Sequence, residues 1–256
     1  MAEIELTRKD GVATLLVNRA ERRNALSSPM MAEMARLVAE IDRDDSVRAL
    51  VVTGAGKVFC SGLDLGAMGL TPGEPALERE LVDQVLLPLD RLSKPTIAAM
   101  NGDALAGGLE LGLHCDVRLA VPTARFGMPV AKIGIVVPYP LLLKLVDLVG
   151  PATTSELLFT GEPMSADRAY SLAMVNRLVA PESLLEEAHR MAATIAGNAP
   201  LAVRAMKRAI LAGRSQRQWD PPEDVRRLYD EARSSEDARE GIAAINEKRR
   251  PVFRGR

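Results

Sequence analysis

The chain has 256 residues, of which 47% are hydrophobic, and its 33 basic and 34 acidic side chains nearly cancel. This length suits one large domain, or one domain with an appendage, and the apolar share is enough to bury a sizeable core. The charge balance argues against a basic surface for nucleic acid and gives no reason for binding to an anionic membrane. We therefore expect neither nucleic acid nor a membrane as a partner.

The residues that most often bind metals are few and scattered. The cysteines Cys60 and Cys115 and the histidines His114 and His189 show no metal-ligand spacing, so we expect no metal site. The N-terminal residues include early acids and no apolar stretch typical of a signal peptide. No apolar run reaches the roughly eighteen residues that a membrane span requires. A cytoplasmic protein is the expectation that follows.

Strand and helix patterns alternate in the first half of the chain. Residues 12–17 follow Asp10-Gly11 and predict the second arm of a hairpin. Ser28, as N-cap, and Pro29 predict the start of a helix whose apolar face is Met30, Met34, Leu37, Val38 and Ile41. Short apolar runs predict buried strands at residues 50–53, 96–100 and 117–120. This alternation predicts an α/β fold.

The connections and the C-terminal part follow other patterns. Glycine and proline at 66–75 predict a mobile surface loop, and 77–92 predicts a helix that Pro88 should kink. After about residue 140 helix follows helix, with a capping box at Ser183 and Glu186, a start at Pro200 and a cap at Ser234-Ser235. We place a boundary near residue 195. It separates an α/β core, residues 1–195, from a helical region, residues 196–256.

One glycine-rich turn invites a phosphate-loop interpretation, which we reject. Gly56-Lys57 would require a glycine at position 51 and a serine or threonine at position 58. Both positions are valine, Val51 and Val58. The stretch is therefore predicted to be a tight turn after a strand.

A second glycine-rich stretch, residues 101–110, carries more chemistry. It runs from a strand through a turn into a helix, and backbone N–H groups at a helix start are free donors that can hold a developing oxyanion. Glu110 lies one turn further, within an apolar run, where burying an acid is costly without a purpose or a partner. A polar position facing solvent is an equally good explanation from spacing alone.

Nine segments, in order and at the usual intervals, resemble the crotonase superfamily, the enoyl-CoA hydratase/isomerase family. The resemblance covers nearly the whole chain, and the segments are jointly specific although each alone is weak. They are NALS (24–27), TGAGKVFCSGLDL (53–65), KPTIAAMNG (94–102), AGGLEL (106–111), CDVR (115–118), LFTGE (158–162), VNRLV (175–179), PLAV (200–203) and EKRRP (247–251).

The resemblance implies a fold, an assembly and a reaction type. The fold is a crotonase (ClpP-like) spiral of ββα units with a helical C-terminal trimerisation region, which makes homotrimers or homohexamers. The backbone N–H groups of Leu63 and Gly107 are implied to hold the oxygen of an acyl-CoA thioester as an enolate forms. Glu110 is implied to be the acid/base group. Coenzyme A enters as part of the substrate, and no other cofactor is implied.

Further residues match positions that border the substrate in the family. Those near the adenine, the phosphates and the acyl group are implied to be Arg23 (or its neighbour Arg22), Ala25, Leu26, Ser61, Gly62, Asp64, Leu65, Gly108, Val130 and Tyr139. Lys248 and Phe253 lie in the C-terminal segment that touches CoA, sometimes across a subunit boundary.

One departure from the family pattern leaves the reaction open. The family's hydratases carry a second glutamate where this chain has Val130, and valine cannot transfer a proton. A single acid can still shuttle a proton between carbons, as an isomerase requires. Pro138-Tyr139 is similar to a pair in methylmalonyl-CoA decarboxylases, although those carry histidine where this chain has Leu63.

Hydratase, isomerase and decarboxylase therefore remain open, with a non-catalytic acyl-CoA-binding protein as an alternative of another class. Val130 mildly favours such a binding protein, whereas the retained Glu110 speaks against it. An RNA-binding relative is disfavoured, because no basic stripe with interleaved aromatic residues is visible. His114 is interpreted as a packed histidine, and Cys60 and Cys115 as small buried residues.

Overall fold

The computed structural model describes residues 2–64, 77–214 and 234–252, together with 223, 226–227, 230 and 254. Two sites from the sequence analysis, Leu65 and Phe253, lie outside the described residues. So does the loop expected at 66–75.

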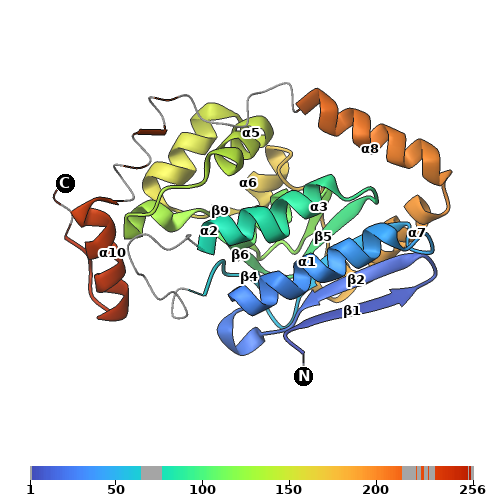
Figure 1. The fold of residues 1–256 in the computed structure, drawn as a ribbon, viewed down its shortest axis with the longest axis horizontal. Helices are drawn as coiled ribbons and strands as arrows, with labels where there is room; N and C mark the ends of the chain where they lie inside the picture. Colours follow the sequence, from blue (N-terminus) through green and yellow to red (C-terminus); the bar gives the residue numbers. More distant parts are fainter. Residues whose placement is uncertain are drawn as a thin grey trace.

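Two sheets organise the molecule (Figure 1). The larger one has the strand order β1 (Ile4–Lys9), β2 (Val12–Val17), β3 (Ala49–Gly54), β5 (Thr96–Met100), β7 (Val117–Ala120) and β10 (Arg177–Leu178). Its β1–β2 pair is the predicted antiparallel hairpin, and the other neighbours are parallel. The smaller sheet has the order β4 (Val58–Cys60), β6 (Asp103–Leu105), β8 (Arg125–Gly127) and β9 (Met164–Ser165).

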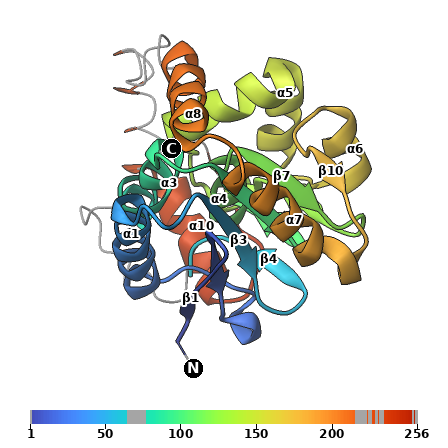
Figure 2. The ribbon, with the colours of Figure 1, turned by 90° about the vertical axis from the view of Figure 1, so that its right-hand side faces the viewer.

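The chain visits the two sheets in turn, which makes a spiral. Each of β3, β5 and β7 in the larger sheet is followed directly by β4, β6 or β8 in the smaller one, and then by helical structure. This confirms the predicted α/β fold of ββα units. Strands β3 and β5 are buried along their whole length, because helices cover both faces of the larger sheet. Figure 2 shows α1 (Ser28–Arg43) and α7 (Leu184–Ala196) on opposite sides of β3.

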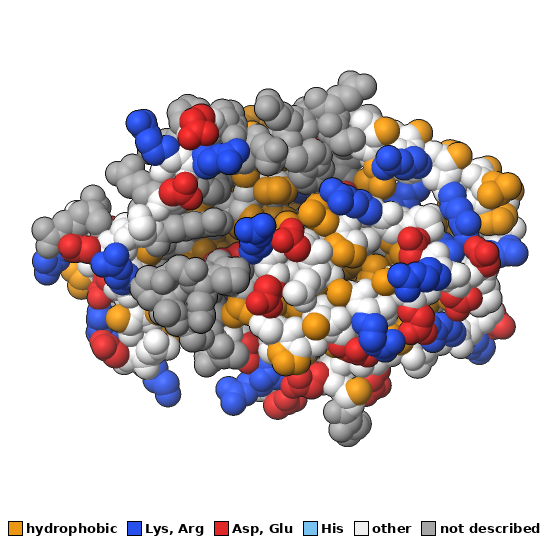
Figure 3. Space-filling view, in the orientation of Figure 1, with side chains coloured by type: hydrophobic (Ala, Val, Ile, Leu, Met, Phe, Trp, Pro, Cys, Tyr) orange, Lys and Arg blue, Asp and Glu red, His pale blue; other side chains and the backbone are white. Residues whose placement is uncertain are grey.

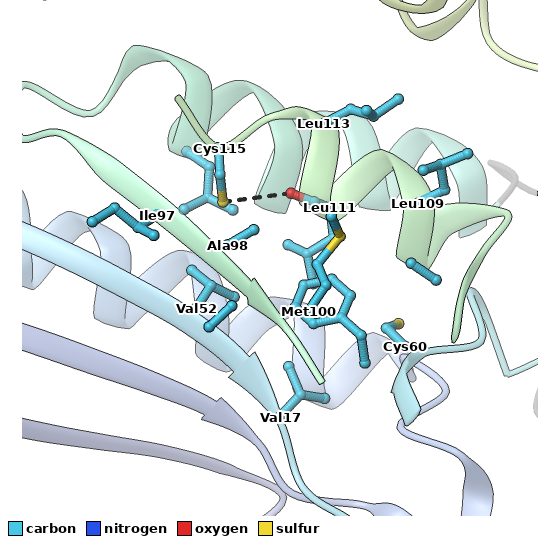
Figure 4. Packing of buried hydrophobic residues seen from close by; sticks show 14 of the residues in the cluster. Val17, Val52, Cys60, Ile97, Ala98, Met100, Leu109, Leu111, Leu113 and Cys115 are labelled. Carbon is cyan, nitrogen blue, oxygen red and sulfur yellow. Dashed lines mark hydrogen bonds between the residues drawn. The ribbon is translucent and has the colours of Figure 1, made fainter. Parts of the chain in front are cut away.

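The core lies between the larger sheet and α4 (Gly107–Leu113), as Figure 4 shows. Val52 of β3 and Ile97 of β5 face the helix there, and Leu111 points back towards them. The thiol of Cys115 donates to the Leu111 carbonyl over 3.7 Å, and burial raises the pKa of both cysteines, Cys60 and Cys115, to about 12. Both are therefore inert packing residues, as the sequence predicted.

Two helix starts differ from the sequence prediction. Helix α1 has Ser27 as its N-cap, one residue before the predicted Ser28, although its predicted apolar face is buried. The capping box predicted at Ser183 is wrong, because Ser183 has helical backbone angles and makes no cap hydrogen bond. The short 3₁₀ helix η4 (Pro181–Ser183) leads directly into α7, so no extended capping residue precedes it. The predicted cap of the last helix is confirmed, since the Ser235 hydroxyl accepts from the N–H of Ala238 over 3.0 Å.

The helix predicted at 77–92 has three parts: α2 (Leu77–Glu80), the π-helical segment η2 (Leu81–Leu86) and α3 (Leu87–Arg91). Pro88 lacks an N–H and disturbs the hydrogen-bond ladder before it. The preceding N–H, of Leu87, donates to the Val82 carbonyl five residues back, which is π-helical spacing. The proline thus changes the helical period where the helix passes α4.

The C-terminal half is mostly helical, with the two short strands β9 and β10 as an unpredicted addition. Its remaining elements are η3 (Pro129–Ile133), α5 (Tyr139–Thr160), α6 (Ala166–Ser171), α8 (Pro200–Arg214) and α10 (Glu236–Asn246). In the N-terminal part there is one more short 3₁₀ helix, η1 (Ala20–Arg22). Lys207 of α8 donates to the Asp116 carboxylate over 2.7 Å and to the Lys94 carbonyl over 2.9 Å. These bonds tie α8 to the core. The boundary near residue 195 stays a prediction.

Very close packing joins α4 to β4. A Cβ atom on Gly108 would lie 2.0 Å from the carbonyl oxygen of Cys60, which is backbone and cannot give way cheaply. We expect Gly108→Ala to lower the free energy of unfolding by about 1–3 kcal/mol, measured by urea denaturation. Gly197→Ala is the matched control, because its nearest neighbour would be 3.5 Å away. Equal stability of the two variants would contradict this packing.

Candidate active site

The first part of the site is a short pairing of two distant segments. The N–H of Leu26 donates to the Gly62 carbonyl over 2.8 Å, and the N–H of Asp64 donates to the Leu26 carbonyl over 2.8 Å. Leu63 lies opposite Leu26 in this parallel bridge, so its own N–H and C=O point away from the pairing. The N–H of Ser61 donates to the Arg23 carbonyl over 3.1 Å. The structure thus brings together five predicted substrate-binding residues and one predicted donor: Arg23, Ala25, Leu26, Ser61, Gly62 and Leu63.

Two polar residues that the sequence analysis did not single out hold this pairing. Asn24 is fully buried, with φ of 57°, and its side chain donates to the Ala55 and Val58 carbonyls over 2.9 and 2.7 Å. The Arg19 guanidinium donates to the Asp64 carboxylate over 2.7 Å. Asp64, predicted to border the substrate, therefore takes part in an ion pair that fixes the turn. The available clue in the sequence was the residue type, because asparagine adopts the left-handed conformation more readily than most other residues.

The second part of the site is the turn between β6 and α4. Ala106 has φ of 48° and ψ of −125°, which is unusual and costly for a residue other than glycine. A Cβ atom on Gly62 would lie 3.1 Å from the backbone nitrogen of Gly107. A Cβ atom on Gly107 would lie 3.7 Å from the backbone nitrogen of Leu63. The two turns are in contact, and Gly62, with φ of 103° and backbone atoms 3.1 Å from a would-be Cβ, needs to be glycine where they meet.

The contact places two backbone donors side by side. Within the described part of the chain, neither the Leu63 N–H nor the Gly107 N–H donates to a protein acceptor. Two adjacent N–H groups of this kind fit one oxygen atom that accumulates negative charge. The arrangement can therefore act as an oxyanion site, in agreement with the donors that the family resemblance implies.

Glu110 supplies a titratable group next to these donors. It lies three residues after Gly107 in α4 and is 5% exposed. Desolvation by burial, followed by the charge of Glu78, raises the pKa of Glu110 to about 8. A carboxyl group with a pKa near neutrality is suited to both accept and donate a proton.

The remaining predicted residues lie further along the chain. Val130 is half-buried in η3 and packs against the core, and Tyr139 is the half-buried first residue of α5. Lys248 is exposed just after α10, with φ of 53°. Helix α10 packs tightly on η3, since a Cβ atom on Gly241 would lie 2.1 Å from the Ile133 carbonyl oxygen. The C-terminal segment is thereby held against the element that carries Val130.

His114 lies one turn beyond Glu110 and is buried. Its Nδ1 bonds to the backbone carbonyl of Glu110 over 2.8 Å, with the carbonyl as acceptor. This bond supports the interpretation as a packed histidine.

Among the described residues, no group of three or more histidine, cysteine or acidic side chains could hold a metal ion. None of the described helices has the length and apolar character needed to cross a membrane.

The raised pKa of Glu110 predicts a pH dependence of stability. Between pH 4.5 and about 8 the unfolded chain has lost this proton while the folded chain keeps it, so stability falls as the pH rises through this window. Glu110→Gln removes the titration and should flatten the dependence, measured by urea denaturation at several pH values from about 5 to 8.5. Glu182→Gln, at an exposed glutamate, is the control and should follow the unmodified protein. Parallel curves for all three proteins would refute the burial argument.

Comparison with known proteins identifies the family. The sequence model of the Enoyl-CoA hydratase/isomerase family matches residues 7–256. The short-chain-enoyl-CoA hydratase of Clostridium acetobutylicum is 36% identical over 96% of this chain and 95% of its own. The carnitinyl-CoA hydratase of Mycobacterium avium superposes with a TM-score of 0.86, at 34% identity and 99% coverage of both chains.

A third relative has a different reaction in its name. Methylmalonyl-CoA decarboxylase, in complex with 2-nitronate-propionyl-CoA, superposes with a TM-score of 0.90, at 25% identity over 100% of this chain and 99% of its own. The match to the family extends over nearly the whole chain, through both turns and Glu110. The chain belongs to the enoyl-CoA hydratase/isomerase family, within the crotonase superfamily, and is an enzyme of that family.

Proposed function

We propose that this enzyme acts on an acyl-CoA thioester through an enolate, with Glu110 moving the proton at the α-carbon. The observation that carries the proposal is the contact of the two glycine turns one helical turn from a buried carboxyl group. The thioester oxygen would accept from the N–H groups of Leu63 and Gly107. The α-carbon adjoins the thioester carbon, so it would lie within reach of Glu110.

This geometry suits an enolate because charge develops on the oxygen as a proton leaves or arrives at carbon. Fixed backbone donors stabilise that charge without reorganising, and removing one such donor typically costs about 100- to 1000-fold in rate. The apolar surroundings of Glu110 hold its proton near neutral pH, which matches the acid/base task. Coenzyme A is part of the substrate in this proposal, and no other cofactor takes part.

The first turn also suggests where the CoA part lies. Arg23 is exposed and Ala25 borders the turn that carries the Leu63 donor, so both lie where a group extending from the thioester would pass. Lys248 is a further cation, on the segment that follows α10. We propose that these residues border the adenine and phosphates of CoA, with Phe253 from the same C-terminal segment.

Hydration of an enoyl-CoA is the reaction we place first. Two relatives at 34% and 36% identity are named as hydratases. Isomerisation or decarboxylation is the second candidate, because Val130 carries no proton and the Pro138-Tyr139 pair is similar to one in methylmalonyl-CoA decarboxylases. The close superposition with the solved decarboxylase supports this second candidate. An assay of crotonyl-CoA hydration, 3-enoyl-CoA isomerisation and methylmalonyl-CoA decarboxylation side by side separates the candidates.

Glu110→Gln tests the proposal directly. We expect the variant to lose about 100- to 10,000-fold of whichever reaction is found, because the amide cannot exchange a proton. Acetyl-CoA binding, followed by calorimetry, should stay close to that of the unmodified protein. Glu182→Gln, at an exposed site, should keep full activity. Full activity of Glu110→Gln, or no binding of acetyl-CoA at millimolar concentration, would overturn the proposal.

We also propose a cytoplasmic homotrimer or homohexamer. Helix α8 carries three large hydrophobic side chains that face solvent, Leu201, Met206 and Ile210, which are 78%, 59% and 65% exposed. Figure 3 shows hydrophobic side chains gathered on the surface in the region of α8. Apolar surface of this kind favours association. Light scattering at micromolar concentration should give the mass of three or six chains, and Met206→Glu should shift the mass towards the monomer. A monomeric unmodified protein would contradict the assembly.

A further inference from the structure

The helical segment that begins at α2 lies directly over the oxyanion turn. A Cβ atom on Gly107 would lie 2.8 Å from the Cδ2 atom of Leu81, the first residue of η2. Leu81 is 1% exposed. The side chain of Leu81 therefore packs against Gly107 on the side where a Cβ atom would stand, and its helix forms a wall of the candidate site.

Glu78 lies on the same face of this helix as Leu81. The two residues are three positions apart, which places their side chains next to each other along a helix. Glu78 is half-buried, whereas the side chain of its neighbour Arg79 is 78% exposed and pairs with Asp83 over 3.4 Å. The helix thus has an outer charged pair and an inner face that carries Leu81 and Glu78.

Glu78 and Glu110 interact electrostatically. After desolvation, the charge of Glu78 is the cause that raises the pKa of Glu110. When two carboxyl groups share a site, one tends to hold a proton while the other is ionised. Glu110 of α4, three residues after Gly107, and Glu78, three residues before the Leu81 that packs on Gly107, thus approach the oxyanion turn from two different helical segments.

We propose that Glu78 is the second acid–base residue of this site and takes the proton from water during hydration of an enoyl-CoA thioester. The inference rests on the proposed function, and it assigns a residue to the proton transfer that Val130 cannot perform. Hydration needs one group to accept a proton from water and another to donate one to carbon. Glu110 and Glu78 together meet that requirement.

The proton and electron balance is complete with these two groups. The water oxygen forms a bond to the β-carbon of the enoyl thioester while the Glu78 carboxylate takes one water proton. The electron pair of the carbon–carbon double bond shifts towards the thioester oxygen, held by the N–H groups of Leu63 and Gly107. Glu110 then gives its proton to the α-carbon and becomes a carboxylate. A proton returning from Glu78 to Glu110 through solvent restores the starting state.

Glu78→Gln tests the assignment, with two reactions measured side by side. Crotonyl-CoA hydration needs both carboxyl groups, whereas exchange of the α-protons of butyryl-CoA in heavy water needs Glu110 alone. We expect Glu78→Gln to lose hydration by at least about 100-fold and to keep exchange within a few-fold of the unmodified protein. The pH midpoint of exchange should fall, because a negative charge near Glu110 is gone.

Two further variants complete the test. Asp83→Asn removes a carboxylate from the outer face of the same helix and should leave both reactions unchanged. Glu78→Asp keeps the charge with a shorter reach and should retain more hydration than Glu78→Gln. Thermal unfolding of every variant shows whether a loss of rate comes from a loss of fold, and the Glu78→Asp result decides the matter if Glu78→Gln is unstable.

The outcomes separate this inference from the proposed function. Hydration by Glu78→Gln at the rate of Asp83→Asn would overturn the role of Glu78 and leave Glu110 in place. So would an unmodified protein that exchanges α-protons without hydrating crotonyl-CoA. An equal loss of exchange and hydration in a folded Glu78→Gln would also overturn it, because the defect would not be specific to water. Unchanged exchange in Glu110→Gln would instead overturn the proposed function.

Discussion

The site depends on one steric constraint, the close approach of two turns at positions where a side chain does not fit. A Cβ atom on Gly62 would meet the backbone nitrogen of Gly107, and one on Gly108 would meet the Cys60 carbonyl. Backbone donors can be brought next to each other only where no Cβ atom separates the segments. The buried Asn24 and the Arg19–Asp64 pair then fix the first turn from the outside. Geometry at the oxyanion position is therefore a property of the fold rather than of any single reactive side chain.

Burial of Glu110 follows from the same packing and has a cost. Helix α4 packs on β4, β6 and η2, so the side chain of Glu110, its fourth residue, is removed from water. The ionised form is penalised there, and the pKa moves towards the pH at which an acid/base group is most useful. Above that pH the charge is held at the expense of stability. The candidate site thus uses part of the folding free energy to obtain a reactive carboxyl group.

Much of the fold was predictable because its signals are local. The hairpin, the buried strands and the Ser235 cap depend on residues close in sequence, and the structure confirms them. The Ser183 box was wrong because a preceding 3₁₀ turn set the backbone angles there. Within the site, residues 24–26 and 61–64 belong to two segments that resemble the family, so they could be assigned to one site from the sequence. Glu78 had no such signal, since its position relative to Glu110 is decided by how η2 packs on α4 across more than twenty residues of intervening chain.

The proposed backbone oxyanion site would explain why chains with this fold differ in the reactions that their names state. A hydratase at 34% identity and a decarboxylase at 25% identity superpose on this chain equally completely. Under this proposal the fold would keep constant the stabilisation of charge on one oxygen, which any enolate reaction requires. The identity and position of the proton-transfer groups around it are set by individual side chains, from α4, from η3 or from the helix above the turn. Val130 removes a carboxyl group from one position around the thioester oxygen, and the proposed role of Glu78 would supply one from another position.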